Sequence, residues 1–473
     1  MSARRHVDAR ELLGAAWDAL DAREAQLEPF DPHPALAVDA DRFGAAVDEW
    51  LGRLAAPAAE RPAGAVGTYP FGHPRYAGQM LKPPHPVALA AYAAAARLNP
   101  NNHALDGGPG TSAMEKEAVG WIAAAMGFPE STLGHLTGGG TVANLEALWV
   151  ARESHPGRGV AVSEAAHYTH TRMAAVLGMD AHAVPADARD RIDLDALDAL
   201  LAGGRVGTVV LTAGTTGTGA VDPIADGVAL ARRHGVRVHV DAAYGGFFRL
   251  LAGHGLPGFP DADFDAVGRA DSLVIDPHKH GLQPYGCGCV LFRDPAVGRH
   301  YRHDSPYTYF TSDALHLGEI SLECSRPGAA AAALWLTLRA LPLAPDDGLG
   351  PILRACLSAA GRFAAAVEAS AALELVAPSG LDIVIYRPAA GSASRVDRRS
   401  ASLFARAMEA ERPVFTSLYR VPAARLGPGV DADVPHARVL RSVLLKPEHE
   451  AWAELLVADL DVLARGATDP DAP

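Results

Sequence analysis

The feature that most constrains the fold is a series of short, uninterrupted apolar segments in the middle of the chain. They read VGTVVLTA (206–213), VRVHV (236–240), SLVI (272–275) and CGCVLF (287–292). A strand that is apolar at nearly every position is buried on both faces, whereas a strand with one solvent-exposed face alternates apolar and polar residues. Because helical sequence separates such segments, the pattern predicts an α/β fold with a largely parallel sheet covered on both faces.

The whole chain divides into three predicted parts. Residues 1–85 contain an amphipathic helix and then an irregular stretch rich in proline and glycine, at a predicted dimer interface. Residues 86–344 form the large domain, in which 114–127, 141–153 and 328–341 have the apolar spacing of helices. In the predicted N-terminal helix, one face is apolar and carries Leu12, Leu13, Trp17 and Leu20.

The third part, residues 345–473, is predicted to be a small α+β domain. Residues 381–387 and 437–445 read as strands, and the polar sequence GSASRVDRRSAS (391–402) between them reads as a surface loop. A final helix is expected over residues 448–465.

Composition narrows the classes of function. The 473 residues have a formal net charge of −13, which argues against a general nucleic-acid-binding surface. No apolar run approaches the roughly 18 residues that span a bilayer, and the charged N-terminus lacks a signal-peptide core. The four cysteines fit neither a disulfide scaffold nor a zinc ribbon. We therefore expect a cytoplasmic enzyme without membrane or nucleic-acid partners.

Two segments could bind an anion or an aromatic ring. In LTGGGTVANLEAL, three glycines and Thr141 lead into a helix, whose first-turn N–H groups and dipole favour a phosphate, although such a turn can also be purely structural. In SEAAHYTHTRMAAVLG, His167 follows a strand-like segment, where its ring could stack on a ligand or serve only as a structural histidine.

Two further segments supply an acid and an amine. Asp241 ends the strand in HVDAAYGG, where it could hold a pyridine nitrogen cationic or cap a helix. Lys279, in DPHKHG, could be a solvated loop residue or a nucleophile that forms a Schiff base with an aldehyde. A metal site is not expected, because His278 and His280 point to opposite sides of an extended chain and no further ligands complete a set.

Together these segments provide an anion cradle, an aromatic lid, an acid for a ring nitrogen and a lysine for an aldehyde. Pyridoxal 5′-phosphate (PLP) has a matching chemical handle for each of them. The four segments also follow predicted strands or begin helices, which is where open α/β sheets build their sites.

The same segments resemble the group II PLP-dependent amino-acid decarboxylases of fold type I, which include aromatic-L-amino-acid, tyrosine, histidine and glutamate decarboxylases. The resemblance covers about residues 70–465. It rests on LTGGGTVANLEAL, AAHYTHTRMAAVLG, TAGTTGTGAVDPI, HVDAAYGG and ADSLVIDPHKHGLQPYGCGCVLFRD, and on NPNNHALDGGPGTSAMEKE, which is similar to the substrate-entry segment of the family.

The resemblance implies a role for each matching residue. Lys279 carries the Schiff base, Asp241 pairs with the pyridine nitrogen, and the ring lies between Ala243 and His167. The other residues that it implies around the cofactor are Gly140, Thr141 and His278 at the phosphate and Thr216 beside the ring oxygen or the aspartate. Ser112, Tyr307, Tyr309 and Arg441 are implied at the substrate end.

The expected reaction is decarboxylation of an L-amino acid to the amine and CO2, in a homodimer with shared active sites. Oxidative formation of an aldehyde, or other PLP lyase or transaminase chemistry, is the alternative, and a catalytically silent scaffold is a further one. Tyr307, Tyr309 and Phe310 are all candidates for the loop position that separates the first two outcomes in this family. Val142 and His280 depart from the family pattern, which commonly has glutamate and tryptophan there.

Overall fold

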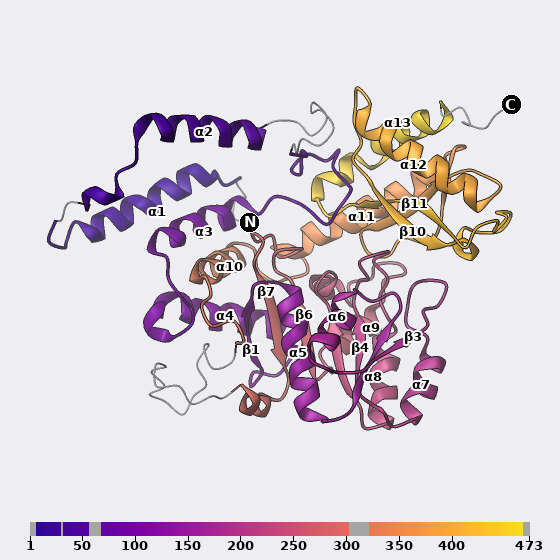
Figure 1. Cartoon of the computed structure of the whole chain (residues 1–473), viewed down its shortest axis with the longest axis horizontal. Coiled ribbons are helices and arrows are strands. Elements are labelled where there is room, and N and C mark those ends of the chain that lie inside the picture. The colour runs from indigo at the N-terminus through magenta and orange to yellow at the C-terminus, as the bar shows by residue number, and fades with distance from the viewer. Residues whose placement is uncertain (1–5, 30–31, 56–67, 302–320, 467–473) are drawn as a thin grey trace.

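The computed structural model describes residues 6–29, 32–55, 68–301 and 321–466 (Figure 1). The helices are α1 (Ala9–Glu24), α2 (Ala40–Ala55), α3 (Pro86–Leu98), α4 (Pro109–Ala125), α5 (Gly140–Ser154), α6 (Thr169–Val176), α7 (Leu194–Ala202), α8 (Ile224–Arg233), α9 (Asp261–Val267), α10 (Gly328–Ala340), α11 (Leu349–Glu368), α12 (Ala393–Glu409) and α13 (Ala453–Arg465). No helix in these ranges is long and apolar enough to cross a membrane.

A seven-stranded sheet forms the centre of the larger part, in the order β1-β7-β6-β5-β4-β2-β3. Its strands are β1 (Leu133–Thr137), β2 (Gly159–Ser163), β3 (Ala181–Val184), β4 (Val206–Thr212), β5 (Arg237–Asp241), β6 (Ser272–Ile275) and β7 (Gly288–Phe292). The five strands from β6 to β3 are parallel, whereas β7 runs antiparallel to both of its neighbours. The prediction of a mostly parallel sheet is therefore confirmed.

Both faces of this sheet are covered, because successive residues of one strand belong to different cores. Leu273 and Ile275 of β6 belong to the larger core, to which α7, α8 and α10 contribute. Val274, between them, belongs to a second core with the apolar residues of α5. Every residue of β6 is thus buried, which explains its continuous apolar sequence.

The C-terminal domain contains a four-stranded antiparallel sheet in the order β10-β11-β9-β8. These strands are β8 (Leu373–Leu375), β9 (Ile383–Pro388), β10 (Ser417–Pro422) and β11 (His436–Val443). Phe363 of α11 and Tyr386 of β9 are fully buried in its core, with residues of α12 and α13. In Figure 1 this domain lies at the upper right, above the seven-stranded sheet, and α1 and α2 lie at the upper left.

One expectation from the sequence is wrong. The polar pattern of residues 391–402 predicts a surface loop, but from Ala393 these residues form the first half of α12. Val396, Ser400, Leu403 and Ala407 are buried at helical spacing, so the helix is amphipathic. Arg395, Asp397 and Arg398 lie outside this buried stripe, and the apolar residues that would reveal a helix continue beyond residue 402.

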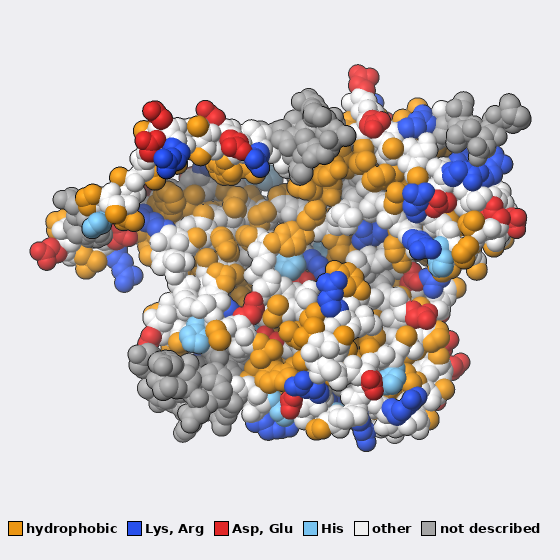
Figure 2. Space-filling view, in the orientation of Figure 1, with side chains coloured by type: hydrophobic (Ala, Val, Ile, Leu, Met, Phe, Trp, Pro, Cys, Tyr) orange, Lys and Arg blue, Asp and Glu red, His pale blue; other side chains and the backbone are white. Residues whose placement is uncertain are grey.

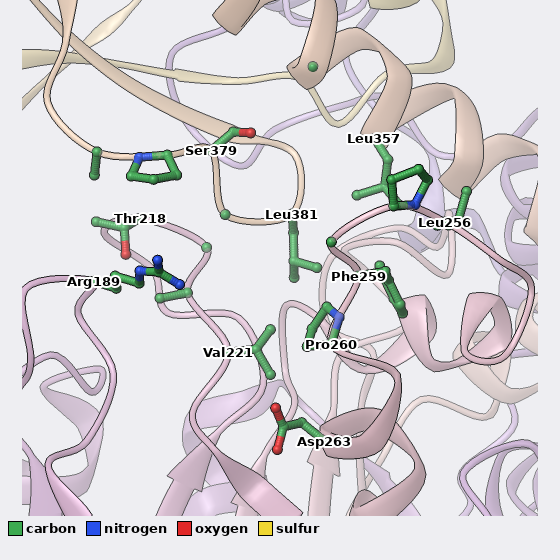
Figure 3. Close-up of a pocket in the computed structure, with 18 of the residues that line it drawn as sticks. Arg189, Thr218, Val221, Leu256, Phe259, Pro260, Asp263, Leu357, Ser379 and Leu381 are labelled. Carbon is green, nitrogen blue, oxygen red and sulfur yellow. The ribbon is translucent and has the colours of Figure 1, made fainter.

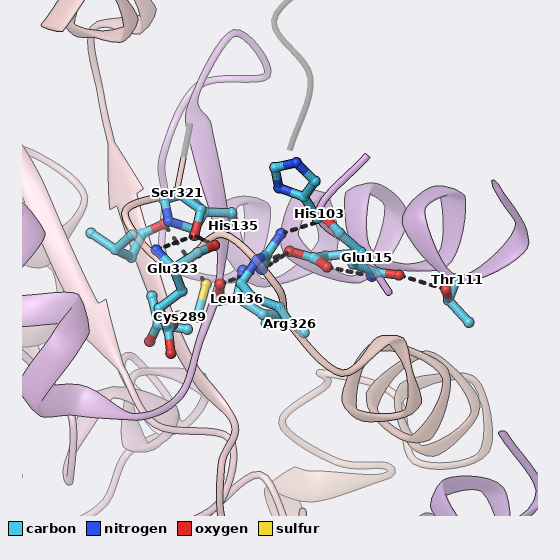
Figure 4. Close-up of polar contacts among 12 residues, drawn as sticks. His103, Thr111, Glu115, His135, Leu136, Cys289, Ser321, Glu323 and Arg326 are labelled. Carbon is cyan, nitrogen blue, oxygen red and sulfur yellow. Dashed lines mark hydrogen bonds and ion pairs between the residues drawn. The ribbon is translucent and has the colours of Figure 1, made fainter. Parts of the chain in front are cut away.

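A buried polar network joins three segments at the edge of the large sheet (Figure 4). The carboxylate of Glu115 accepts hydrogen bonds from the backbone N–H of Leu136 at 2.9 Å and from Asn102 Nδ2 at 2.7 Å. Arg326 Nη1 lies 2.8 Å from the same carboxylate and 2.6 Å from the carbonyl oxygen of Leu136. The network ties α4, β1 and the segment that leads into α10 together, and it leaves neither charge unpaired.

Glu115→Ala should destabilise the protein by about 3–5 kcal/mol, because it leaves the Arg326 guanidinium buried without its counter-ion. Urea-induced unfolding measures this change. Glu454→Ala is the matched control, since Glu454 forms an exposed ion pair with Arg362 and its loss should leave the unfolding curve nearly unchanged. Equal behaviour of the two variants would contradict a structural role for the buried network.

Candidate active site

A cavity of about 310 Å³ lies at the carboxyl end of the large sheet. Its lining residues lie at the ends of β4 and β5 or in the segments that follow β1, β2, β4, β5 and β6. Ligand sites of open α/β sheets form at this edge, because the loops after parallel strands converge there. All eight residues that the sequence assigns to the cofactor line this one cavity: Gly140, Thr141, His167, Thr216, Asp241, Ala243, His278 and Lys279.

A glycine turn at the start of α5 lines the cavity. Gly139 has a φ of 146°, which side chains rarely adopt, and no side chain caps the first turn of the helix among the described residues. A Cβ atom at Gly140 would lie 2.6 Å from Asp276 Oδ2, so the close approach of these two segments requires glycine. The uncapped N–H groups and the helix dipole suit an anionic group.

Asp241, which also lines the cavity, is ionised despite its burial. Burial alone would raise the pKa of its carboxyl group, but the hydrogen bond and charge of His170 and the charge of Lys279 outweigh burial and hold that pKa well below its usual value. His170 Nε2 donates to Asp241 Oδ2 at 2.8 Å, and the Ala243 N–H donates to Oδ1 at 3.1 Å. A buried carboxylate fixed in this way can hold a ring nitrogen protonated.

Lys279 follows β6 on a tight turn, and its Nζ atom lies 3.1 Å from Asp276 Oδ2. The lysine side chain is 20% exposed and the aspartate side chain 3% exposed. Both residues line the cavity, and the aspartate is the more deeply buried of the two. His278 Nδ1 lies 2.9 Å from the Cys287 carbonyl oxygen and therefore carries a proton as a donor.

His167 lies in the connection between β2 and α6, and it is half-buried. Burial lowers its pKa, so the neutral ring dominates at neutral pH. The Thr169 N–H donates to Nδ1 at 3.3 Å, which leaves Nε2 to carry the proton of the neutral imidazole. The geometry thus defines which nitrogen can donate a proton.

The residues of the cavity fit PLP. The Oγ1 atoms of Thr169 and Thr212 and Oδ1 of Asp276 are buried at the cavity without a hydrogen-bond partner among the described residues. Buried polar atoms in folded proteins normally have partners, so these orphaned atoms indicate a polar ligand. The glycine turn, the ionised Asp241 and Lys279 would hold its phosphate, ring nitrogen and aldehyde respectively.

The residues assigned to the substrate end are not all brought to the cavity. Ser112 is fully buried in α4, and its Oγ atom has no partner among the described residues. Arg441 of β11 donates to the carbonyl oxygens of Thr216 at 2.7 Å and Gly217 at 3.0 Å, so it supports the loop that carries Thr216. Tyr307 and Tyr309, with Phe310, lie outside the described residues.

Sequence reasoning missed several residues of the site. Asp276 stands in the same DPHK motif as Lys279, so a signal was present. His170 has no such signal, because only the fold brings α6 against the end of β5. Tyr244 lines the cavity, and its hydroxyl donates to Asp382 of the C-terminal domain at 2.5 Å.

His280 turns away from the cavity. Its Nε2 atom lies 3.2 Å from Asp382 Oδ2, and both side chains are fully buried. Burial lowers the pKa of His280, while the nearby charge of Asp382 opposes this effect. The residue after Lys279 therefore joins the lysine-bearing turn to the C-terminal domain.

Comparison with known proteins agrees with this geometry. Residues 71–388 match the pyridoxal-dependent decarboxylase conserved domain. A probable L-tyrosine/L-aspartate decarboxylase of Methanopyrus kandleri is 33% identical over 68% of this chain and 85% of its own length. An L-2,4-diaminobutyrate decarboxylase of Rhizobium meliloti is 33% identical over 64% of this chain and 63% of its own length.

Solved structures share the fold. Mouse CSAD has a TM-score of 0.75 and 22% identity over 96% of this chain and 92% of its own. Oryza sativa TDC, determined with PLP and tryptamine, has a TM-score of 0.74 and 20% identity over 96% of this chain and 98% of its own. The fold type I architecture, the PLP cofactor and amino-acid decarboxylation expected from the sequence are confirmed, and the chain belongs to the pyridoxal-dependent decarboxylase family.

Proposed function

We propose that the cavity at the carboxyl end of the large sheet is the active site in which an L-amino acid loses CO2 to give the corresponding amine. The observation that carries this proposal is that Lys279 and the ionised Asp241 line one cavity with the uncapped start of α5. When bound, PLP supplies the aldehyde that links to an amine and the ring that accepts the electron pair of the broken bond.

The residues of the chain divide the remaining tasks. Asp241 would hold the ring nitrogen of bound PLP in its protonated form, because its carboxylate is ionised and fixed by His170. Lys279 provides the amine that anchors the aldehyde, and Asp276 orients that amine from 3.1 Å.

His167 lines the cavity and is a candidate donor of the proton that must return to the carbon atom after CO2 leaves. Its neutral ring has Nδ1 engaged by the Thr169 N–H, so the remaining proton sits on Nε2. Tyr307 and Tyr309 are the alternative donors, in the segment outside the described residues. The donor decides between simple decarboxylation and oxidation to an aldehyde, because a proton must return to the carbon that lost CO2.

The products of a substrate panel separate these outcomes. Each proteinogenic L-amino acid and L-2,4-diaminobutyrate is incubated with the PLP-loaded enzyme, and CO2, amine, aldehyde, ammonia and peroxide are measured. We expect CO2 and amine in equal amounts from one substrate class. Aldehyde with ammonia and peroxide would favour the oxidative alternative, and a keto acid would favour transamination.

Lys279→Ala should abolish turnover and remove the visible absorbance of the lysine-bound cofactor, because no other described residue that lines the cavity carries an amine. Absorption spectra and CO2 release measure the two effects. Lys82→Ala, which removes a partly buried lysine outside the cavity, is the control for loss of a lysine side chain from the interior. Normal turnover in Lys279→Ala would end the Schiff-base proposal.

His170→Phe should weaken PLP binding most at low pH. Without His170, burial raises the pKa of Asp241, so the carboxylate is present above the new pKa and is lost as the pH falls through it. The ratio of variant to wild-type PLP dissociation constants should grow by about tenfold for each pH unit below that pKa.

Titration of the apo proteins with PLP at several pH values measures this ratio. His170→Gln is the control, because its amide N–H can still donate to Asp241. A ratio that stays constant with pH would contradict the role of His170 in keeping Asp241 ionised.

We further propose that the protein is a homodimer in which α2 embraces the partner subunit, and that it works in the cytoplasm. Phe43, Trp50 and Leu54 lie on one side of α2, and more than half of each side chain is exposed. Figure 2 shows apolar side chains on α2 and on the surface beneath it. Exposed aromatic groups on a helix that stands apart from its own chain favour an intermolecular contact.

The buried, unpaired thiols of Cys287, Cys289 and Cys356 fit a reducing compartment.

The double variant Phe43→Asp/Trp50→Asp should shift the protein from dimer to monomer, because it places charge in an apolar interface. Sedimentation velocity measures the change. Glu49→Gln, on the charged side of the same helix, is the control and should leave the dimer intact. A double variant that stays dimeric at low concentration would place the interface elsewhere.

A further inference from the structure

A second cavity, of about 580 Å³, lies between the large domain and the C-terminal domain (Figure 3). No described residue is shared between its lining and that of the proposed active site. The large domain contributes the loop after β4, the segment before α7 and residues 256–260, and the C-terminal domain contributes α11 and residues 377–381. The volume lies in the range of small-molecule sites.

The two walls of this cavity are held against each other by backbone contacts. Gly219 has a φ of 72°, and a Cβ atom there would overlap the carbonyl oxygen of Gly380. Arg425 of the C-terminal domain forms an ion pair with Asp190 and donates to the Asp187 carbonyl oxygen at 3.2 Å. The cavity is therefore a fixed feature of the domain contact and not a loose gap between two bodies.

The interior of the cavity is apolar. Val221, Phe259, Leu357 and Leu381 point into the space in Figure 3, and none of them is fully buried. Leu381 has a φ of 49°, a conformation that a leucine adopts only where surrounding structure holds it. Water in contact with these side chains is displaced favourably by an apolar ligand.

The charged groups of the wall favour an anion. Among the described residues three arginines line the cavity, and two of them already have partners: Arg191 donates to Asp187 Oδ2 at 2.7 Å, and Arg354 lies 3.3 Å from Asp346. The Arg189 guanidinium has no hydrogen-bond or ion-pair partner in the described parts of the chain, although its backbone N–H donates to Asp187. A guanidinium binds carboxylates with two parallel hydrogen bonds.

The one acidic side chain that the described residues place in the wall is already engaged. Asp263 Oδ1 accepts the Ala225 N–H at 3.0 Å, in the first turn of α8. This hydrogen bond explains the position of Asp263 without a cationic ligand. Asp263 therefore does not change the preference of the cavity for an anion.

We propose that this interdomain cavity is a second binding site, for a small organic carboxylate with an apolar body, whose carboxylate pairs with Arg189. The loop from Gly214 to Val221 connects the two cavities, since Thr216 lines the active site and Val221 lines the interdomain site. A ligand here contacts a loop that also reaches the cofactor.

Isothermal titration of the PLP-loaded enzyme tests the proposal with 4-phenylbutyrate and its neutral analogue 4-phenylbutan-1-ol. We expect the acid to bind about tenfold more tightly than the alcohol, as for one charge-assisted contact. Arg189→Gln should abolish this difference. Equal affinities of the wild-type enzyme for the two compounds, or absence of binding, would overturn the proposal.

Gly361→Leu tests the location. Gly361 lines the cavity on α11, and a Cβ atom there meets nothing within 4 Å, so a leucine side chain should enter the cavity and prevent binding. Gly120→Leu, at a glycine of α4 with equally open surroundings, is the matched control and should bind as the wild type does. Binding that survives Gly361→Leu with an unchanged affinity would refute the site. Thermal unfolding verifies that each variant is folded, and Arg189→Gln tests the same site without a change in packing.

Discussion

The rest of the site depends on one buried carboxylate, Asp241, that stays ionised. It ends β5 in the middle of the parallel sheet, where water does not compensate its charge. His170 reaches it from α6 with a 2.8 Å hydrogen bond, and Lys279 contributes a nearby positive charge. Without these groups, burial would raise the pKa of Asp241 and favour its protonated form, which cannot keep a ring nitrogen cationic. The electrostatic state of the centre is thus set by three segments that meet at one sheet edge.

The C-terminal domain takes part in this arrangement although none of its described residues lines the cofactor cavity. Asp382 accepts a hydrogen bond from Tyr244 and lies 3.2 Å from His280, the residues just beyond Asp241 and Lys279 along the chain. Arg441 in the same domain holds the carbonyl oxygens of the loop that carries Thr216. A buried carboxylate or guanidinium that loses its hydrogen-bond partners is costly, so these contacts fix the position of the domain relative to the active site.

Sequence patterns predicted most of the strands and helices that can be recognised from one contiguous segment of the chain. The four apolar segments from 206 to 292 correspond to β4, β5, β6 and β7, and the helical spacing over 114–127 corresponds to α4. The error at 391–402 arose because this short window is mostly polar and contains only the first part of an amphipathic helix, whose apolar residues Leu403 and Ala407 lie beyond it. The antiparallel direction of β7 was also beyond the pattern, since a buried strand reads the same in either direction.

The sequence by itself determined which chemical groups are available and that they follow strand ends, because the glycine turn, Asp241 and Lys279 are recognisable from their local motifs alone. It could not determine which groups meet across long separations. His170 and Asp241 are 71 residues apart, and Tyr244 and Asp382 are 138 apart. Only the tertiary structure decided these partners, as it decided the cavity between the domains, because hydrogen bonds and packing act over a few ångströms in space and leave no periodic trace along the chain.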